Sequence, residues 1–246
     1  MASGRSSHDH AQVPTQRDYD TDPGRYRLGT ALTSAHGAPQ TDLHSRIVRL
    51  LHHAGVVRVL DVGCGAGALA AAAAGMVRVI GVDAAATMIG AASRHGPAIR
   101  AEATALPVAD GAVDAVVAVN VLDHLDRPGD GLLEAHRVLR RGGLLVAGTI
   151  SRADSPELAP FWRPARTPFD TEDAPAQVAA VFGSTGTQPW DAPLITLPDR
   201  DAVRDYLRVR FVPPGQAERL ADALVHRGPL PLPVTKRGAL VLAHRA

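Results

Sequence analysis

The residues best suited to chemistry lie in a glycine-rich segment, Val59–Gly67, which reads Val-Leu-Asp-Val-Gly-Cys-Gly-Ala-Gly. Its glycines let the backbone bend sharply and approach a ligand closely. Apolar residues precede the bend as a short predicted strand, and Ala68 opens a helix whose free N–H groups face the same ligand. The spacing Gly63-x-Gly65-x-x-Ala68 satisfies the relaxed dinucleotide fingerprint. Taken alone, this run is weak evidence for one ligand.

Asp83 sharpens the prediction, because it ends the next predicted strand, 20 positions after Gly63. A carboxylate there can accept hydrogen bonds from both hydroxyl groups of a ribose. Each hydrogen bond to a charged acceptor contributes roughly 1.5–3 kcal/mol, so loss of Asp83 is expected to weaken binding strongly. A structural role for Asp83, as the cap of the following helix, stays open and is compatible with the first.

Alternating apolar and helical patterns position these residues. Strands are predicted at 56–62, 77–82, near Ile99, at 113–119 and at 144–150. Helices are predicted from 42 to Gly55, at 68–74, at 86–94, and from Pro128 to a basic C-terminus at 140–142. The continuous apolar run 144–150 is typical of a strand covered by helices on both faces. The alternation therefore predicts a doubly wound α/β fold.

The regular alternation of predicted strands and helices ends after residue 150. A proline-rich stretch leads to a predicted helix at 173–182, a strand at 193–197, helices at 199–209 and 214–226, and a last strand at 239–244. We expect a disordered tail over 1–18 and an ordered arm over 19–40. The core is expected to comprise 19–197 plus 237–246, with 198–236 as a helical insertion that covers the substrate.

Composition excludes several classes of protein. The net charge of +1 disfavours a dedicated nucleic-acid binder, which usually shows a basic face. Cys64 is the only cysteine, so an internal disulfide and a multi-thiolate metal site are excluded. No apolar run approaches the roughly 18 residues of a membrane span, and the N-terminus lacks the apolar region of a secretory signal. A cytoplasmic protein is therefore the default expectation, with no membrane partner.

Four segments beside the glycine run occur in an order typical of one family. They are 79–83 with Met88, 102–107, 113–117 leading into 120–125, and 137–145. With the run from Val59 to Gly67 they resemble the class I S-adenosylmethionine-dependent methyltransferases, in the branch that acts on small molecules. The resemblance covers about residues 42–150. It implies a mostly parallel, seven-stranded Rossmann-like sheet, with the helical insertion before its last strand.

The resemblance also implies a cofactor site for S-adenosyl-L-methionine. The residues that it assigns to the cofactor are Asp61, Gly63, Cys64, Gly65, Asp83, Ala84, Met88, Glu102, Ala103 and Asn120. Asp61 and the glycine backbone would hold the methionine part, with Cys64 as a small filler. Asp83 would hold the ribose, and Asn120 would lie under the sulfonium. Glu102 departs from the family, which usually has aspartate there.

The predicted reaction moves a methyl group to a small-molecule acceptor by in-line displacement, without a metal. Positioning supplies much of the rate, and a general base is needed when the acceptor must lose a proton. His124 is the candidate base, with Tyr19, Tyr26 and His36 as alternatives. Two other functions stay open, an NAD(P)-dependent oxidoreductase and a non-catalytic S-adenosylmethionine-binding protein. The only lysine lies at 236, which rules out a Tyr-x-x-x-Lys pair and disfavours the oxidoreductase.

Overall fold

The computed structural model of the chain describes residues 20, 22–38 and 43–246. The tail expected at 1–18 and the candidate base Tyr19 lie outside the described residues, and both stay predictions.

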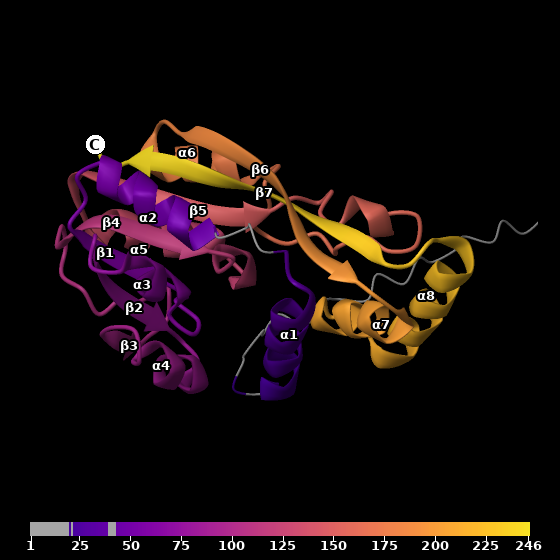
Figure 1. Ribbon diagram of the computed structural model, residues 1–246. Helices are drawn as coiled ribbons and strands as arrows, with labels where there is room; N and C mark the ends of the chain where they lie inside the picture. Colours follow the sequence, from indigo (N-terminus) through magenta and orange to yellow (C-terminus); the bar gives the residue numbers. More distant parts are fainter. Residues whose placement is uncertain (1–19, 21, 39–42) are drawn as a thin grey trace, which may run out of the picture.

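One seven-stranded sheet forms the centre of the molecule, in the order β3-β2-β1-β4-β5-β7-β6 (Figure 1). The strands are β1 Arg58–Val62, β2 Arg78–Asp83, β3 Ala98–Arg100, β4 Val113–Val119, β5 Leu139–Ile150, β6 Gly186–Leu197 and β7 Leu232–His244. The first five pair in parallel, whereas β7 runs antiparallel to both β5 and β6. The predicted α/β fold with a mostly parallel, seven-stranded sheet is confirmed.

Helices cover both faces of the sheet. They are α1 Pro23–His36, α2 Leu43–His53, α3 Ala68–Ala73, α4 Ala86–Ala92, α5 Pro128–Val138, α6 Ala174–Phe182, α7 Arg200–Val209 and α8 Pro214–Arg227, with short 3-10 turns η1 Leu122–His124 and η2 Pro156–Leu158. Alternate residues of β1 point to opposite faces, so Leu60 packs in the cluster that holds α5 and α6, and Val59 in the cluster that holds α2 and α3.

A third apolar cluster lies beyond this core. The ends of β6 and β7 extend past the parallel strands and pack with α1, α7 and α8 (Figure 1). Tyr206 and Leu207 of α7 and Leu32 of α1 are buried members of this cluster. It places α1, from the N-terminal part of the chain, against α7 and β6 from the C-terminal part. None of the helices among the described residues has the length and apolarity needed to cross a membrane.

Several predicted elements need correction. Residues 140–142 were expected to close a helix, but α5 ends at Val138 and these residues belong to β5. The pairing of β5 with β4 is irregular here, with a register shift between Val113 and Ala115 of β4. The ordered arm contains α1, whose weakly amphipathic sequence hides its helical period. β7 begins at Leu232, so the last residues of the expected insertion 198–236 are strand.

β6 begins at Gly186, well before the predicted strand at 193–197. Pro189 and Pro193 interrupt its sequence and disguise the strand. Both are tolerated because β6 is the edge strand of the sheet, where a missing N–H costs no ladder partner on the open side.

Candidate functional site

The glycine bend after β1 is shaped by two positions with different needs. Gly63 has φ +69°, and a Cβ there would lie 2.1 Å from Cγ2 of Val121, so no larger residue fits. Gly65 has φ +53°, but a Cβ there would meet nothing within 4 Å, because this part of the bend faces open space. The first glycine thus serves packing, whereas the second exposes backbone to a ligand.

Asp83 ties this bend to the end of β2. One carboxylate oxygen accepts a hydrogen bond from the Gly65 N–H and the other accepts from the Ala85 N–H, both at 2.9 Å. Asp83 is buried, and it lies at the carboxyl end of its strand as the sequence predicts. The N-cap position of α4 is Ala85, so Asp83 is not the helix cap itself.

Asp61 and Cys64 lie deeper in the bend. Burial raises the pKa of the Asp61 carboxyl to about 8, and the nearby Asp83 carboxylate adds to the rise. No residue that the structure describes hydrogen-bonds to the Asp61 carboxyl. Burial, then Asp61 and Asp83, raise the pKa of the Cys64 thiol to about 12, so it stays protonated and suits the predicted filler role.

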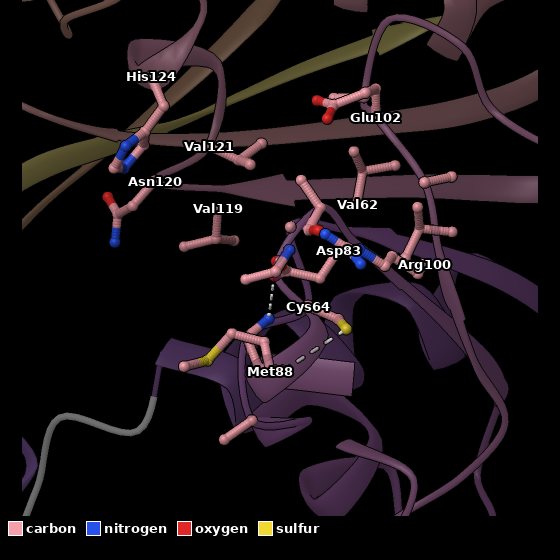
Figure 2. Close-up of a pocket in the computed structure, with 18 of the residues that line it drawn as sticks. Val62, Cys64, Asp83, Met88, Arg100, Glu102, Val119, Asn120, Val121 and His124 are labelled. Carbon is pink, nitrogen blue, oxygen red and sulfur yellow. Dashed lines mark hydrogen bonds between the residues drawn. The ribbon is translucent and has the colours of Figure 1, made fainter. Parts of the chain in front are cut away.

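A cavity of about 580 Å³ opens above the bend (Figure 2). Ten predicted site residues line it: Gly63, Cys64, Gly65, Asp83, Ala84, Met88, Glu102, Ala103, Asn120 and His124. Among the residues predicted to hold the cofactor, Asp61 is the one outside its wall. Figure 2 shows Asn120 and His124 toward one end of the cavity, and Glu102 and Arg100 toward the other.

Sequence reasoning missed Arg100 and His44 in the cavity wall. Arg100 ends β3, and its Nε donates to the Ala84 carbonyl at 2.9 Å. Its place at a strand end next to Ala101 and Glu102 is the signal that could have found it. His44 begins α2 and gives no comparable signal.

Asn120 is held in an unusual conformation at the end of β4. Its φ is +53°, which few residues other than glycine adopt but asparagine tolerates. Its backbone N–H donates to the Gly148 carbonyl at 2.8 Å. Among the described residues, its buried Oδ1 has no hydrogen-bond partner. A buried acceptor without a partner is costly, which indicates that a ligand group supplies the missing contact.

Of the candidate bases that the structure describes, two line the cavity and one does not. His124 lies in η1 with its Nε2 3.9 Å from Oδ1 of the buried Asp123. Tyr26 of α1 lines the same cavity, whereas His36 does not.

An N-terminal residue also reaches the site. The two Asp20 carboxylate oxygens accept from the N–H groups of Ala86 and Thr87, both at 2.9 Å, and so cap α4. Asp20 also lies 3.8 Å from the Arg100 guanidinium. Hydrogen bonds from Thr87 and Ala86, and the Arg100 charge, hold the pKa of Asp20 below its usual range. This contact fastens the start of the described chain beside the cavity.

Residues 60–147 match the family model described as a methyltransferase domain. They include the glycine bend, Asp83, Asn120 and His124. This part of the chain is a methyltransferase domain, as the resemblance to the class I S-adenosylmethionine-dependent methyltransferases implies. The recognised family is therefore confirmed for these residues, and members of that family use S-adenosyl-L-methionine.

The chain is similar to several proteins of this kind. It is 38% identical over 125 residues to an uncharacterized methyltransferase of Mycobacterium leprae, covering 48% of this chain and 41% of the relative. It is 32% identical over 105 residues to a ubiquinone biosynthesis O-methyltransferase of Burkholderia cenocepacia, covering 39% and 45%. The chain thus spans less than half the length of these curated relatives.

A solved structure extends the likeness to most of the fold. A possible histamine N-methyltransferase of Thermotoga maritima superimposes with a TM-score of 0.57 at 18% identity, covering 93% of this chain and 98% of that one. At this identity the likeness concerns the fold alone.

The residues present fit the family's cofactor. The open backbone at Gly65 and the unpaired Asn120 Oδ1 offer polar contacts inside a cavity that both polar and apolar residues line. Met88 is buried and offers an apolar wall for a flat ring. The assignment of each residue to a part of the cofactor stays a prediction.

Proposed function

We propose that this chain transfers a methyl group from S-adenosylmethionine to a small-molecule acceptor. The observation that carries the proposal is the single cavity that brings Gly65, Asp83 and the unpaired Asn120 Oδ1 together with His124. It combines a surface for an adenosine-bearing ligand with a titratable group beside it. A non-catalytic binder needs the first feature but not the second.

The bound cofactor supplies a methyl group already activated on a sulfonium. The part left to the chain is to bind and orient. In this proposal the backbone at Gly63 and Gly65 holds the methionine part, Asp83 holds the ribose hydroxyls, and Glu102 with the Ala103 N–H reads the adenine edge. Holding two reactants in line can lower a barrier by roughly 7–11 kcal/mol, so orientation is the main contribution of the chain.

His124 is proposed as the base that takes a proton from an O–H or N–H acceptor. The neutral imidazole accepts this proton on one ring nitrogen, and the neighbouring Asp123 carboxylate stabilises the resulting cation. Tyr26 is the second candidate because it lines the cavity too. His124→Ala is expected to lower kcat about 10²- to 10⁴-fold if His124 is the base, with little change in S-adenosylhomocysteine affinity.

A small acceptor is favoured by two observations. The names of the similar proteins, a ubiquinone biosynthesis O-methyltransferase and a possible histamine N-methyltransferase, both refer to small molecules. The near-neutral net charge disfavours nucleic acid as a partner. The role of residues 198–236 as a substrate cover, and a cytoplasmic location, belong to the same proposal.

Parallel calorimetric titrations with S-adenosylhomocysteine and NADH test the cofactor. We expect binding of S-adenosylhomocysteine alone, and binding of NADH alone would overturn the proposal in favour of an oxidoreductase. Incubation of the full chain with methyl-labelled donor and cell extract then tests the reaction. Cofactor binding without label transfer to any extract fraction would favour the non-catalytic binder.

A further inference from the structure

Lys236 is the only lysine in a chain with 26 lysine and arginine residues. It lies in β7, paired with Ala192 of β6, where the two strands extend beyond the parallel core. Its side chain is half-buried. None of the described residues forms a hydrogen bond or ion pair with its ammonium group. An ammonium withdrawn from water without a counterion is costly, so this position calls for a partner.

The direction of the Lys236 side chain follows from its neighbour. The hydroxyl group of Thr235 donates to Glu157 of η2 at 2.5 Å, which fixes Thr235 on the η2 face of β7. Successive residues of a strand point to opposite faces, so Lys236 lies on the other face. Burial and the nearby Arg210 guanidinium lower the pKa of Lys236, whereas Asp154 and Asp123 counteract this. Arg210, Asp154 and Asp123 are therefore the charged groups that act on the Lys236 ammonium.

Arg210 is the second cation of this group. Its Nη2 donates to Oδ2 of Asp154 and to the Tyr206 hydroxyl, both at 2.8 Å. Its Nε and Nη1 make no hydrogen bond with any residue in the described part of the chain, although the side chain is only 18% exposed. One edge of the guanidinium is thus bound and the other remains available.

Asp154 already has three hydrogen-bond partners and forms no ion pair with Lys236. Besides Arg210, it accepts from the Ser155 hydroxyl at 3.1 Å and from the Arg237 N–H at 2.9 Å. Its carboxylate is paired with Arg210, whereas no carboxylate of the described residues forms an ion pair with Lys236. A ligand carboxylate would supply that ion pair.

The position of this pair relative to the cofactor cavity follows from the strands. β5 ends at Ile150 beside Gly238 of β7, so Lys236 lies just beyond the carboxyl end of β5. His124 lines the cavity and follows β4, which runs parallel to β5. Since these parallel strands end at the same edge of the sheet, Lys236 and its neighbour Arg210 lie at the edge where His124 is.

We propose that Lys236 and the available edge of Arg210 bind a carboxylate of the methyl acceptor and hold its reacting atom toward His124. The inference rests on the proposed methyltransferase function and narrows its substrate class to organic acids. A guanidinium edge matches the planar geometry of a carboxylate, and an ammonium adds a flexible third donor. Lys236 and Arg210 are positioning residues that leave the methyl transfer itself to groups nearer the cofactor.

The single lysine allows a direct test on the full chain. Labelling with lysine carrying ¹³C at Cε gives one lysine resonance, from Lys236. On protein saturated with S-adenosylhomocysteine, we expect benzoate to shift this resonance saturably and to raise the Lys236 pKa. Benzamide, which has the same shape without the charge, is expected to do neither. Equal shifts with both probes, or no shift with benzoate, would overturn the proposal.

Substitutions separate the two cations from general charge effects. Arg210→Gln is expected to weaken benzoate binding about ten- to a hundredfold, the cost of losing hydrogen bonds to a charged group. Arg227→Gln is the matched control, because Arg227 is an exposed arginine at the end of α8. Equal affinity in wild type and Arg210→Gln would remove Arg210 from the subsite.

The reaction provides an independent readout. With labelled methyl donor and cell extract, we expect the labelled product to bind an anion exchanger at neutral pH. Lys236→Met is expected to raise KM for that acceptor at least about tenfold with kcat nearly unchanged. A neutral product formed equally well by Lys236→Met would overturn the subsite while methyl transfer stands. Failure to bind S-adenosylhomocysteine at all would instead refute the proposed function.

Discussion

At the scale of single residues, both oxygens of the Asp83 carboxylate accept backbone hydrogen bonds before any ligand is considered. They fix the conformation of the bend at Gly65, and each oxygen keeps a second lone pair for a ribose hydroxyl. Asp83→Ala is therefore expected to lower S-adenosylhomocysteine affinity at least about tenfold, since it removes ligand contacts and the support of the bend. Calorimetric titration measures the change.

A second aspartate controls for loss of stability. Asp114 binds Arg58 and Arg140 at the opposite end of β4, and these hydrogen bonds hold the pKa of its carboxyl far below its usual range despite partial burial. Asp114→Ala is expected to lower the melting temperature and leave the affinity unchanged. If both variants lost affinity equally, the effect of Asp83 would be one of folding alone.

Asp61 makes cofactor binding depend on pH. In the free protein its pKa is about 8, raised from 3.8 by burial and by Asp83, so the neutral acid prevails at pH 7. The cationic ammonium of the ligand favours the carboxylate, and binding should release a proton. Affinity for S-adenosylhomocysteine is expected to rise with pH by up to about tenfold per unit between pH 6 and 8. Calorimetry in buffers of different ionisation enthalpy counts the released protons.

Asp61→Asn separates this effect from other titrations. The variant should bind more weakly, with no proton release and a flat profile between pH 6 and 8. The free wild type should also lose stability as pH rises through 8, because a raised pKa stabilises the fold only while the acid stays protonated. If the affinity of wild type and variant depended on pH in the same way, Asp61 would be excluded as the source of that dependence.

At the scale of elements, α4 depends on a residue far away in the sequence. Asp20 caps its first turn, and α4 carries Met88 into the cavity wall. Loss of this cap should loosen both α4 and the N-terminal segment that Asp20 fastens beside the cavity. Asp20→Ala is expected to speed S-adenosylhomocysteine dissociation by roughly fivefold, as measured by stopped-flow fluorescence or displacement.

Asp22 offers a close control for Asp20. It caps α1 by accepting from the Arg25 N–H at 3.0 Å, and it makes the same kind of contact within its own helix. Asp22→Ala is expected to leave the dissociation rate close to that of wild type. A similar acceleration in both variants would indicate general fraying of α1 instead of a specific fastening at α4.

The cap at α4 also shows where sequence reasoning stops. The bend at Gly63 and the acid at Asp83 were predictable, because their roles depend on residue type, short spacing and strand ends. The contact between Asp20 and α4 joins residues 66 positions apart, and no local pattern marks it. α1 was missed because its apolar side chains are sparse among polar ones, and β6 was shortened because its prolines conceal an edge strand.

At the scale of the whole molecule, β7 connects three separate apolar clusters. Val234 belongs to the outer cluster with α1, α7 and α8, whereas Leu240 and Val241 belong to the clusters on the two faces of the core. This strand therefore runs from the outer helices into the core that carries the cofactor site. The outer cluster has its own buried side chains, so we expect it to open without exposing those of the core.

Leu207 tests whether the outer cluster opens by itself. It lies in α7 with 1% of its surface exposed, and Leu207→Ala is expected to cost about 2–5 kcal/mol. If the clusters are separate cooperative units, amide hydrogen exchange should accelerate in α1, α7 and α8 and stay slow in β1 and β4. Leu60→Ala, at an equally buried core position, should instead accelerate exchange across the whole sheet. Uniform acceleration by Leu207→Ala would mean that β7 couples all three clusters into one unit, and the outer helices could then open for an acceptor only through rearrangement of the core.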